Sequence, residues 1–320
     1  MSICVNRVLV TGGSGFIGSH VVEELLSNGV KGVIIYDRDV SLAKKLFSGN
    51  GRVEIILGNI LDKAALEEAV GRSDAVIHLA AVLGVESTEK MPLNVLRTNL
   101  EGTISALEIS ARKGVKRFVF ASSTEVFGNP PPEMNPLKEN DMKVPVSFYG
   151  FAKLAGENYC QAYHSAGLHT VAVRPSNTYG PRQRPEWVVP MFFDKVLNGQ
   201  PPVLFGSGEQ KRAFCYVKDT AAGIVKALDA PSGEIINLGG GERNVVSMKE
   251  LAQKIITLSG KNLNVVHKDF GEGIRTESRD AVARYFSVEK AQRLLGWTPT
   301  IDIDEGLRRT FEWYSSQKSG

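Results

Sequence analysis

The sequence predicts an α/β protein built on a doubly wound parallel sheet, and three observations carry this prediction. Short apolar runs alternate with amphipathic stretches along residues 7–175. Within each run the residues are apolar almost without interruption, which is typical of strands covered on both faces. A glycine-rich turn, Gly12 to Gly18, joins the first strand to the first helix. Strand, glycine-rich turn and helix in this order are typical of a dinucleotide-binding (Rossmann-type) fold.

The predicted elements follow in order. Apolar runs place strands at 7–11, 33–36, 53–57, 75–79, 116–122 and 170–175. The first helix begins after the glycines and ends at Gly29, where a residue without Cβ can take the left-handed conformation. Asp62 can cap a second helix, because its carboxylate can accept hydrogen bonds from free amides. Longer helices are expected at 92–113 and 147–166.

The second half of the chain differs in composition, with many prolines from about Gly180. We therefore expect a nucleotide-binding domain at 1–179 and a smaller, mainly substrate-binding lobe at 180–320. A stretch at 213–217, a helix after Asp219 and a strand at 234–238 are expected to return to the first domain. Ser247 with Glu250 forms a capping-box pattern, which opens a helix to 258. The run 304–313 is amphipathic, and 129–146 reads as a surface loop.

Composition narrows the class of protein. The 320 residues carry a formal charge of +3 with 23% charged residues and no concentrated basic stretch, so a nucleic-acid partner is not expected. The three cysteines are far apart, which favours reduced thiols in packing roles. No apolar run reaches the ~20 residues that cross a bilayer. We expect a cytoplasmic protein with no membrane partner and, since its five histidines form no ligand cluster, no metal.

A candidate cofactor site lies at the carboxyl ends of the predicted strands. Asp37 follows the second strand, twenty-two residues after Gly15, where an acidic residue can accept hydrogen bonds from an adenosine ribose. This carboxylate favours NAD over NADP, although the adjacent Arg38 could tolerate a 2′-phosphate. Further segments expected at this edge are 12–18, 59–60, 79–81 and 122–125.

Tyr149 and Lys153 are candidate catalytic residues. A separation of four places both side chains on one helical face. A nearby ammonium stabilises a phenolate, so we expect a tyrosine that exchanges a proton near neutral pH. A hydroxyl from the segment 122–125 can hold the substrate oxygen while Tyr149 takes its proton and a nicotinamide takes the hydride. This chemistry is alcohol oxidation.

The motifs together resemble the extended short-chain dehydrogenase/reductases, in particular the NAD-dependent nucleotide-sugar epimerase/dehydratase family. The resemblance rests on TGGSGFIG at 11–18, HLAA at 78–81, Asn99 before Gly102-Thr103, ASSTEVFG at 121–128, Tyr149 with Lys153, RPSNTYGPR at 174–182 and GEQKRAFCYV at 208–217. It implies that Ser123, with Thr124 as its competitor, is the catalytic hydroxyl beside Tyr149, Lys153 and Glu125. The cofactor residues it implies are Gly12, Gly15, Phe16, Ile17, Gly18, Asp37, Arg38, Asn59, Ile60, Leu79, Ala80, Ala81, Asn99, Tyr149, Lys153 and Pro175. The substrate residues it implies are Ser123, Thr124, Asn177, Val189, Arg212 and Arg279.

Two departures from the family pattern concern binding residues. The arginine that usually stands three positions before Asp280 is replaced by Glu277, so either Arg275 or Arg279 is expected to contact the pyrophosphate. Asn59 stands where the family often has aspartate, and its amide still offers a carbonyl to the adenine amino group.

The resemblance implies a nucleotide-sugar substrate and a 4-keto intermediate, and we favour a UDP-hexose 4-epimerase. Glu125 keeps open a dehydratase, in which a carboxylate abstracts the carbon 5 proton, and a UDP-glucuronate decarboxylase. A non-catalytic NAD-binding sensor and an NADPH-dependent dehydrogenase of another alcohol are alternatives from other classes. The family also suggests a homodimer through the helices at 92–113 and 147–166.

Overall fold

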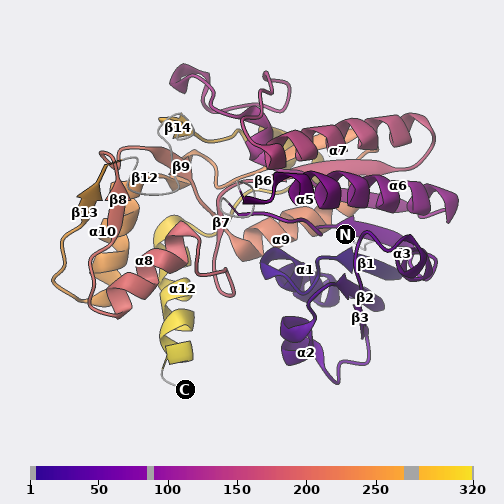
Figure 1. Ribbon diagram of the computed structural model, residues 1–320, viewed down its shortest axis with the longest axis horizontal. Helices are drawn as coiled ribbons and strands as arrows, with labels where there is room; N and C mark the ends of the chain where they lie inside the picture. The colour runs from indigo at the N-terminus through magenta and orange to yellow at the C-terminus, as the bar shows by residue number, and fades with distance from the viewer. Residues whose placement is uncertain (1–4, 85–89, 270–280, 319–320) are drawn as a thin grey trace.

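The computed structural model describes residues 5–84, 90–269 and 281–318. Its main feature is a seven-stranded sheet in which every pairing is parallel. The order is β11 (Glu234–Leu238), β6 (Thr170–Pro175), β5 (Arg117–Ala121), β4 (Ala75–His78), β1 (Arg7–Thr11), β2 (Gly32–Asp37) and β3 (Val53–Leu57). The doubly wound parallel fold predicted from the sequence is therefore confirmed (Figure 1).

Helices cover both faces of this sheet because its strands are apolar on both sides. One face packs against α1 (Phe16–Ser27), α2 (Ser41–Phe47), α9 (Val217–Lys226) and α11 (Glu289–Leu295). The other packs against α3 (Lys63–Val70), α6 (Gly102–Arg112) and α7 (Phe148–Ser165). The long helix expected from Pro92 is present as α5 (Pro92–Leu96), a π-helical turn (Arg97–Glu101) and α6. Gly156 lets α7 approach the sheet, since a Cβ there would collide with the ring of Phe120.

A smaller lobe lies beside the sheet, at the left of Figure 1. Its helices α8 (Val188–Leu197), α10 (Met248–Ser259) and α12 (Ile303–Lys318) share one hydrophobic cluster. Two small sheets belong to it: β12 (Val245–Ser247), β9 (Lys211–Ala213) and β14 (Ala283–Arg284) form one, and β13 (Val266–Lys268) and β8 (Val203–Phe205) the other. The short pair β7 (Thr178–Tyr179) and β10 (Cys215–Tyr216) connects the two parts.

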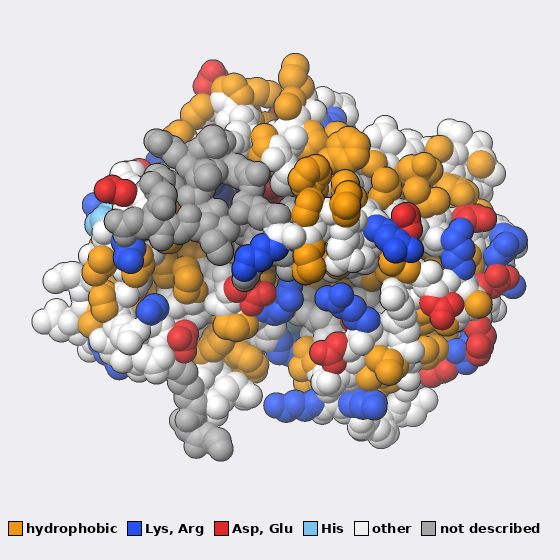
Figure 2. Space-filling model, in the orientation of Figure 1, with side chains coloured by type: hydrophobic (Ala, Val, Ile, Leu, Met, Phe, Trp, Pro, Cys, Tyr) orange, Lys and Arg blue, Asp and Glu red, His pale blue; other side chains and the backbone are white. Residues whose placement is uncertain are grey.

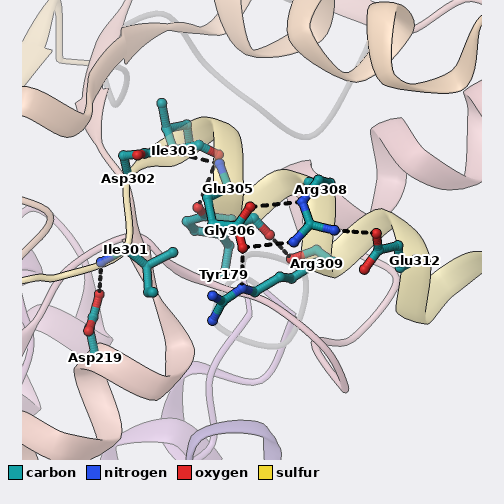
Figure 3. Close-up of polar contacts among 11 residues, drawn as sticks. Tyr179, Asp219, Ile301, Asp302, Ile303, Glu305, Gly306, Arg308, Arg309 and Glu312 are labelled. Atoms are coloured by element: carbon teal, nitrogen blue, oxygen red, sulfur yellow. Dashed lines mark hydrogen bonds and ion pairs between the residues drawn. The ribbon is translucent and has the colours of Figure 1, made fainter.

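The second half of the chain contributes to both parts, as the sequence indicated. β11 joins the large sheet beside β6, and α10 opens with the expected capping box of Ser247 and Glu250. One expected boundary is wrong: α9 begins at Val217 instead of after Asp219. The Asp219 carboxylate accepts hydrogen bonds from Thr300 and Ile301, so it fixes the segment before α12 (Figure 3). The predicted boundary near residue 180 stays a prediction.

The loop at 129–146 projects beyond the sheet near β14 (Figure 1). Leu137 is fully buried and pairs with Phe286, with hydrogen bonds to Tyr285 and Ser287. Asn135 also accepts a hydrogen bond from the Tyr285 amide, so this loop is fastened to the segment after β14 at several points while Met142 and Val144 remain exposed. In the parts of the chain that the structure describes, no helix is long and apolar enough to cross a membrane.

Candidate active site

The turn between β1 and α1 is shaped to receive an anionic group. Gly12 has a φ of 74°, and a Cβ there would lie 2.8 Å from the Ala80 amide nitrogen. A Cβ on Gly18 would overlap the Gly12 carbonyl, so α1 can sit this close to the turn only with glycine. Gly15 is exposed and precedes the free amides of Phe16 and Ile17 at the start of α1. A helix start with open amides is suited to a pyrophosphate.

Asp37 ends β2 beside this turn. Its carboxylate accepts a hydrogen bond from the Ser14 amide at 3.0 Å, which fixes it next to the glycines. Burial raises the pKa of Asp37, and backbone amides, that of Ser14 among them, act against this rise. The neighbouring Arg38 is exposed. The carboxylate therefore lies where the ribose of a dinucleotide bound at the turn would extend.

Other predicted cofactor residues lie along the same edge of the sheet. Ile60 is buried beneath the edge, while Asn59 is exposed and its side-chain carbonyl accepts the Leu61 amide at 3.0 Å. Asn99 is buried, and its amide bonds both the nitrogen and the oxygen of Val82 at 2.7 and 2.8 Å. Asn99 thereby holds the segment after β4, whose partly exposed members are Leu79, Ala80 and Ala81. Pro175 ends β6 on this edge. Their contacts with a cofactor stay predictions.

The end of β5 leads into the predicted catalytic segment. A short 3-10 helix, Thr124–Phe127, begins directly after Ser123, whose hydroxyl accepts the Glu125 amide at 3.2 Å. Ser123 and Thr124 are both buried, with 8% and 6% of their surface exposed. The Ser123 hydroxyl also hydrogen-bonds the side chain of Tyr149. The structure therefore brings Ser123 and Tyr149 together. The choice between Ser123 and Thr124 as the hydroxyl that works with the tyrosine stays a prediction.

Lys153 lies one turn after Tyr149 on α7, with its ammonium 5.6 Å from the centre of the tyrosine ring. The ammonium donates to the Ala121 carbonyl at 2.6 Å and lies over the Phe120 ring. Burial lowers the pKa of Lys153 to about 7. Burial also raises the pKa of Tyr149 to about 12, and the nearby Glu125 acts in the same direction. This direction describes the protein without cofactor. The expected proton exchange near neutral pH, to which a bound nicotinamide cation would add, stays a prediction.

Glu125 has a partner that the sequence did not point to. Its Oε1 accepts a hydrogen bond from Arg284 Nη2 at 2.5 Å, and Arg284 Nη1 donates to the Gly128 carbonyl at 2.9 Å. The Arg284 side chain is 12% exposed and that of Glu125 is 35% exposed, so the pair lies at the edge of the site. Arg284 belongs to β14, which the smaller lobe places beside the catalytic segment. Glu125 follows Ser123 by two residues in the sequence, so its ion pair with the Arg284 guanidinium lies next to the predicted catalytic hydroxyl.

The predicted substrate residues lie in different settings. Arg212 on β9 is buried, is paired in register with Arg284, and donates to the Ala281 carbonyl at 2.8 Å. Asn177 has a φ of 37° and donates to the Ala213 carbonyl. Val189 is only 1% exposed within the core of the smaller lobe, a packing position. Arg275 and Arg279, the candidates for the pyrophosphate, lie outside the described residues. Basic side chains surround the hollow in the middle of the face shown in Figure 2.

A buried ion pair beneath the site was also missed from the sequence. Arg174 on β6 has no exposed surface, and its guanidinium holds both oxygens of Glu157 on α7 at 2.7 Å. The Ser122 hydroxyl donates to the same carboxylate at 2.5 Å. Glu157 follows Lys153 by four residues, and Arg174 directly precedes Pro175. A charged residue within an apolar stretch was the sequence signal that could have revealed this buried ion pair.

His78 is a core residue. Its ring nitrogens lie 2.7 Å from the Thr11 hydroxyl and 3.1 Å from that of Thr103. Complete burial, with a smaller effect of Lys153, lowers the pKa of His78 to about 3. Cys160 and Cys215 are free and buried, while Cys4 lies outside the described residues. Across residues 5–84, 90–269 and 281–318, no group of three or more His, Cys, Asp or Glu side chains is arranged to hold a metal.

The fold and the β1 turn define a Rossmann-type protein suited to a dinucleotide, with Ser123, Tyr149 and Lys153 gathered at the edge of its sheet. The residues fit NAD, since the turn leaves no room for side chains at Gly12 and Gly18 and places Asp37 beside it. Comparisons with known proteins also indicate a NAD-binding site. The profile of the NAD dependent epimerase/dehydratase family matches residues 8–239.

Similar proteins act on nucleotide sugars by different reactions. The chain is 34% identical to UDP-N-acetyl-alpha-D-glucosaminuronate decarboxylase of Bacillus cytotoxicus, over 96% of this chain and 97% of that protein. The crystal structure of a UDP-glucose 4-epimerase from Thermotoga maritima superposes with a TM-score of 0.89 at 32% identity, covering 98% and 99% of the two chains. A UDP-glucuronic acid 4-epimerase from Bacillus cereus, solved with UDP-glucuronic acid and NAD, gives 0.87 at 28% identity, covering 97% and 99%.

The chain belongs to the NAD-dependent epimerase/dehydratase family. Its cofactor is NAD, the cofactor of the structural neighbours. Its relatives are epimerases, decarboxylases and dehydratases, so the family fixes the shared chemistry and leaves the final reaction open.

Proposed function

We propose that this protein oxidises a nucleotide-linked hexuronate, a UDP-sugar with a carboxylate at carbon 6, and releases that carboxylate as CO2. The observation that carries the proposal is the Arg284–Glu125 pair beside Ser123 and Tyr149. A guanidinium is the side chain best suited to bind a carboxylate, since its N–H groups match two carboxylate oxygens. A neutral hexose offers no carboxylate to Arg284.

The first step is oxidation of the carbon 4 hydroxyl. Ser123 and Tyr149 hold this hydroxyl, and the tyrosine takes its proton. The Gly12–Gly18 turn and Asp37 would hold NAD, and the bound cofactor would supply the acceptor and donor of the carbon 4 hydride. Lys153 supplies a positive charge one turn away, which favours the phenolate. Burial is the largest of the effects that raise the pKa of Tyr149 to about 12, so the phenolate would also need the positive charge of a bound nicotinamide.

Oxidation of a hexuronate at carbon 4 creates a β-keto acid, since carbon 5 lies between the new ketone and the carboxylate. The bond between carbons 5 and 6 breaks, CO2 leaves, and its electron pair becomes the enolate of the ketone. Carbon 5 then takes a proton from water, for which the partly exposed Glu125 is the nearest carrier. The return of hydride to carbon 4 and of the Tyr149 proton to oxygen 4 completes a UDP-pentose. Arg284 has to release the carboxylate as CO2 forms.

A UDP-hexose 4-epimerase, the reaction favoured by the sequence, is the second candidate. The likeness to the Thermotoga maritima and Bacillus cereus 4-epimerases supports it. In this reaction the 4-keto sugar turns over and receives its hydride on the other face. Neither Glu125 nor a released carboxylate takes part, so this function leaves the Arg284–Glu125 pair without a chemical role.

The experiment is incubation in deuterium oxide with UDP-glucuronate, UDP-N-acetylglucosaminuronate and their neutral counterparts UDP-glucose and UDP-N-acetylglucosamine. Products are separated by chromatography and identified by NMR, with trapped CO2 measured in parallel. We expect one CO2 per sugar and one deuterium at carbon 5 of a UDP-pentose. A hexose or hexuronate inverted at carbon 4, with no CO2 and no deuterium on carbon, would refute decarboxylation and establish the 4-epimerase.

Glu125→Gln supplies the matched control. In a decarboxylase it should allow oxidation and slow the protonation of carbon 5, so the 340 nm absorbance of NADH should rise and persist. In a 4-epimerase the same variant should keep much of its activity. Tyr149→Phe should remove turnover in either case.

A further inference from the structure

Beneath the catalytic residues, two side chains of α7 form hydrogen bonds with two successive residues at the end of β5, Ala121 and Ser122. Lys153 donates to the Ala121 carbonyl at 2.6 Å, and Glu157, one turn later, accepts from the Ser122 hydroxyl at 2.5 Å. The next residue is Ser123. The position of the catalytic hydroxyl therefore depends on two charged side chains of the helix that also carries Tyr149.

Glu157 is itself held from the far side. Arg174 bonds both of its oxygens, donates to the Glu139 carbonyl at 3.1 Å and stacks 4.8 Å above the Phe127 ring. Phe127 ends the 3-10 helix that contains Glu125, and its ring centre lies 5.5 Å from that of Phe286. Arg174 thus supports the catalytic segment from below while it fixes the carboxylate.

We infer that Glu157 is a positioning residue for the proton relay, which orients Ser123 through Ser122 and keeps Lys153 charged, with Arg174 as its counterion. The inference rests on the carbon 4 oxidation within the proposed function, and it holds for either candidate reaction. A structural ion pair could be replaced by packed apolar groups without loss of chemistry. A positioning residue could not be replaced in this way, because the reaction depends on the groups that it orients.

Of the two side chains that act on the pKa of Lys153, Cys160 and Glu157, only the Glu157 carboxylate is charged near pH 7. Burial lowers the pKa of Lys153, and Cys160 and Glu157 act against this fall. Burial also raises the pKa of the Cys160 thiol, so the thiol is neutral near pH 7. Tyr149 and His78 are neutral there as well, for the same physical reason. The Glu157 carboxylate, one turn after Lys153 on α7 and fixed by Ser122 and Arg174, is therefore a negative charge that favours the ammonium.

The test compares Glu157→Gln with the double variant Glu157→Gln/Arg174→Gln, which leaves no buried charge unpaired if the single variant does not fold. Ser122→Ala removes only the hydroxyl contact. Asp219→Asn is the control for general destabilisation, because Asp219 is a buried carboxylate that fixes residues 300–301 away from the site. Each protein is loaded with NAD and first checked by thermal melting.

One readout needs no substrate. In protein labelled with ¹³C-lysine, the Lys153 Cε resonance is assigned with Lys153→Arg and titrated with pH. We expect its midpoint to fall by about one pH unit in both Glu157 variants and to stay unchanged in Ser122→Ala and Asp219→Asn. An unchanged midpoint in the Glu157 variants would overturn the electrostatic part of the inference whatever substrate the enzyme uses.

The second readout is the rate of NAD reduction in a single turnover with the substrate found above. We expect Glu157→Gln and the double variant to lose about tenfold or more in this rate, with KM within about twofold and the alkaline limb of the pH profile moved to lower pH. Ser122→Ala should lose rate with no movement of that limb. A lower melting temperature with unchanged rate and pH profile, as expected for Asp219→Asn, would reduce Glu157 to a structural residue.

Discussion

Arg284→Gln is the perturbation that most directly examines the site, because it removes the guanidinium and leaves a shorter, neutral polar side chain. Arg284 is 12% exposed and contacts Glu125 and the Gly128 carbonyl. A hydrogen bond to a charged group contributes about 1.5–3 kcal/mol. Loss of the contact between Arg284 and a substrate carboxylate should therefore lower kcat/KM for the UDP-hexuronate by about 10- to 150-fold.

The assay is the ratio of kcat/KM between the hexuronate and its neutral hexose, with calorimetric Kd values for both sugars on NAD-loaded protein. Arg284→Gln should lower the ratio, and Arg284→Lys should restore part of it, since a lysine keeps the charge and loses the paired N–H geometry. Arg308→Gln is the control, because Arg308 pairs only with Glu305 and Glu312 on the surface of α12 (Figure 3). An equal loss for hexuronate and hexose would refute the reasoning and leave Arg284 with a role in folding.

Three further outcomes are expected. Asp37→Ala should weaken NAD binding about tenfold and remove the preference over NADP, as calorimetry on cofactor-free protein would measure; NADP binding equal to NAD in the wild type would contradict the role of Asp37. His78, with a pKa near 3 against an ordinary 6.5, binds its proton mainly after unfolding, so stability should fall below pH 6.5 by up to about 1.4 kcal/mol per pH unit in urea titrations, and less in His78→Gln. The exposed side chains of Leu93, Phe151 and Tyr159 lie on α5 and α7, where Figure 2 shows hydrophobic surface, and they predict a homodimer that Phe151→Glu should dissociate; a wild-type monomer by light scattering would reject it.

The elements that the sequence predicted well are those whose own residues determine them. Strands β1, β3 and β6 have the predicted bounds, because each is a mainly apolar run whose own residues favour a strand. Asp62 caps α3 with two backbone hydrogen bonds, and the capping box of α10 is present. The glycine turn and Asp37 follow the same logic, since their chemistry is local to one strand, one turn and one helix.

The parts that the sequence did not reveal arise from contacts between distant segments. β14 is two residues long and exists because it pairs with β9, so no periodicity could place Arg284 beside Glu125. Burial raises the pKa of Tyr149 in the protein without cofactor, which the spacing to Lys153 did not reveal. Asp219 resembled a helix cap but serves a segment eighty residues later.

The return of α9, β11 and α11 to the large sheet has a consequence for engineering. The chain leaves this sheet after β6, comes back for α9 and β11, leaves again for residues 245–284, comes back for α11, and ends in α12. A truncation at residue 179 would strip the edge strand from β6 and the cover from α1, so it would expose apolar surface instead of yielding a cofactor domain. Each excursion, by contrast, starts and ends on the large-sheet part. Helices α8 and α10 belong to these excursions but share one hydrophobic cluster with α12, so a graft of the smaller lobe between relatives would have to transfer α12 as well.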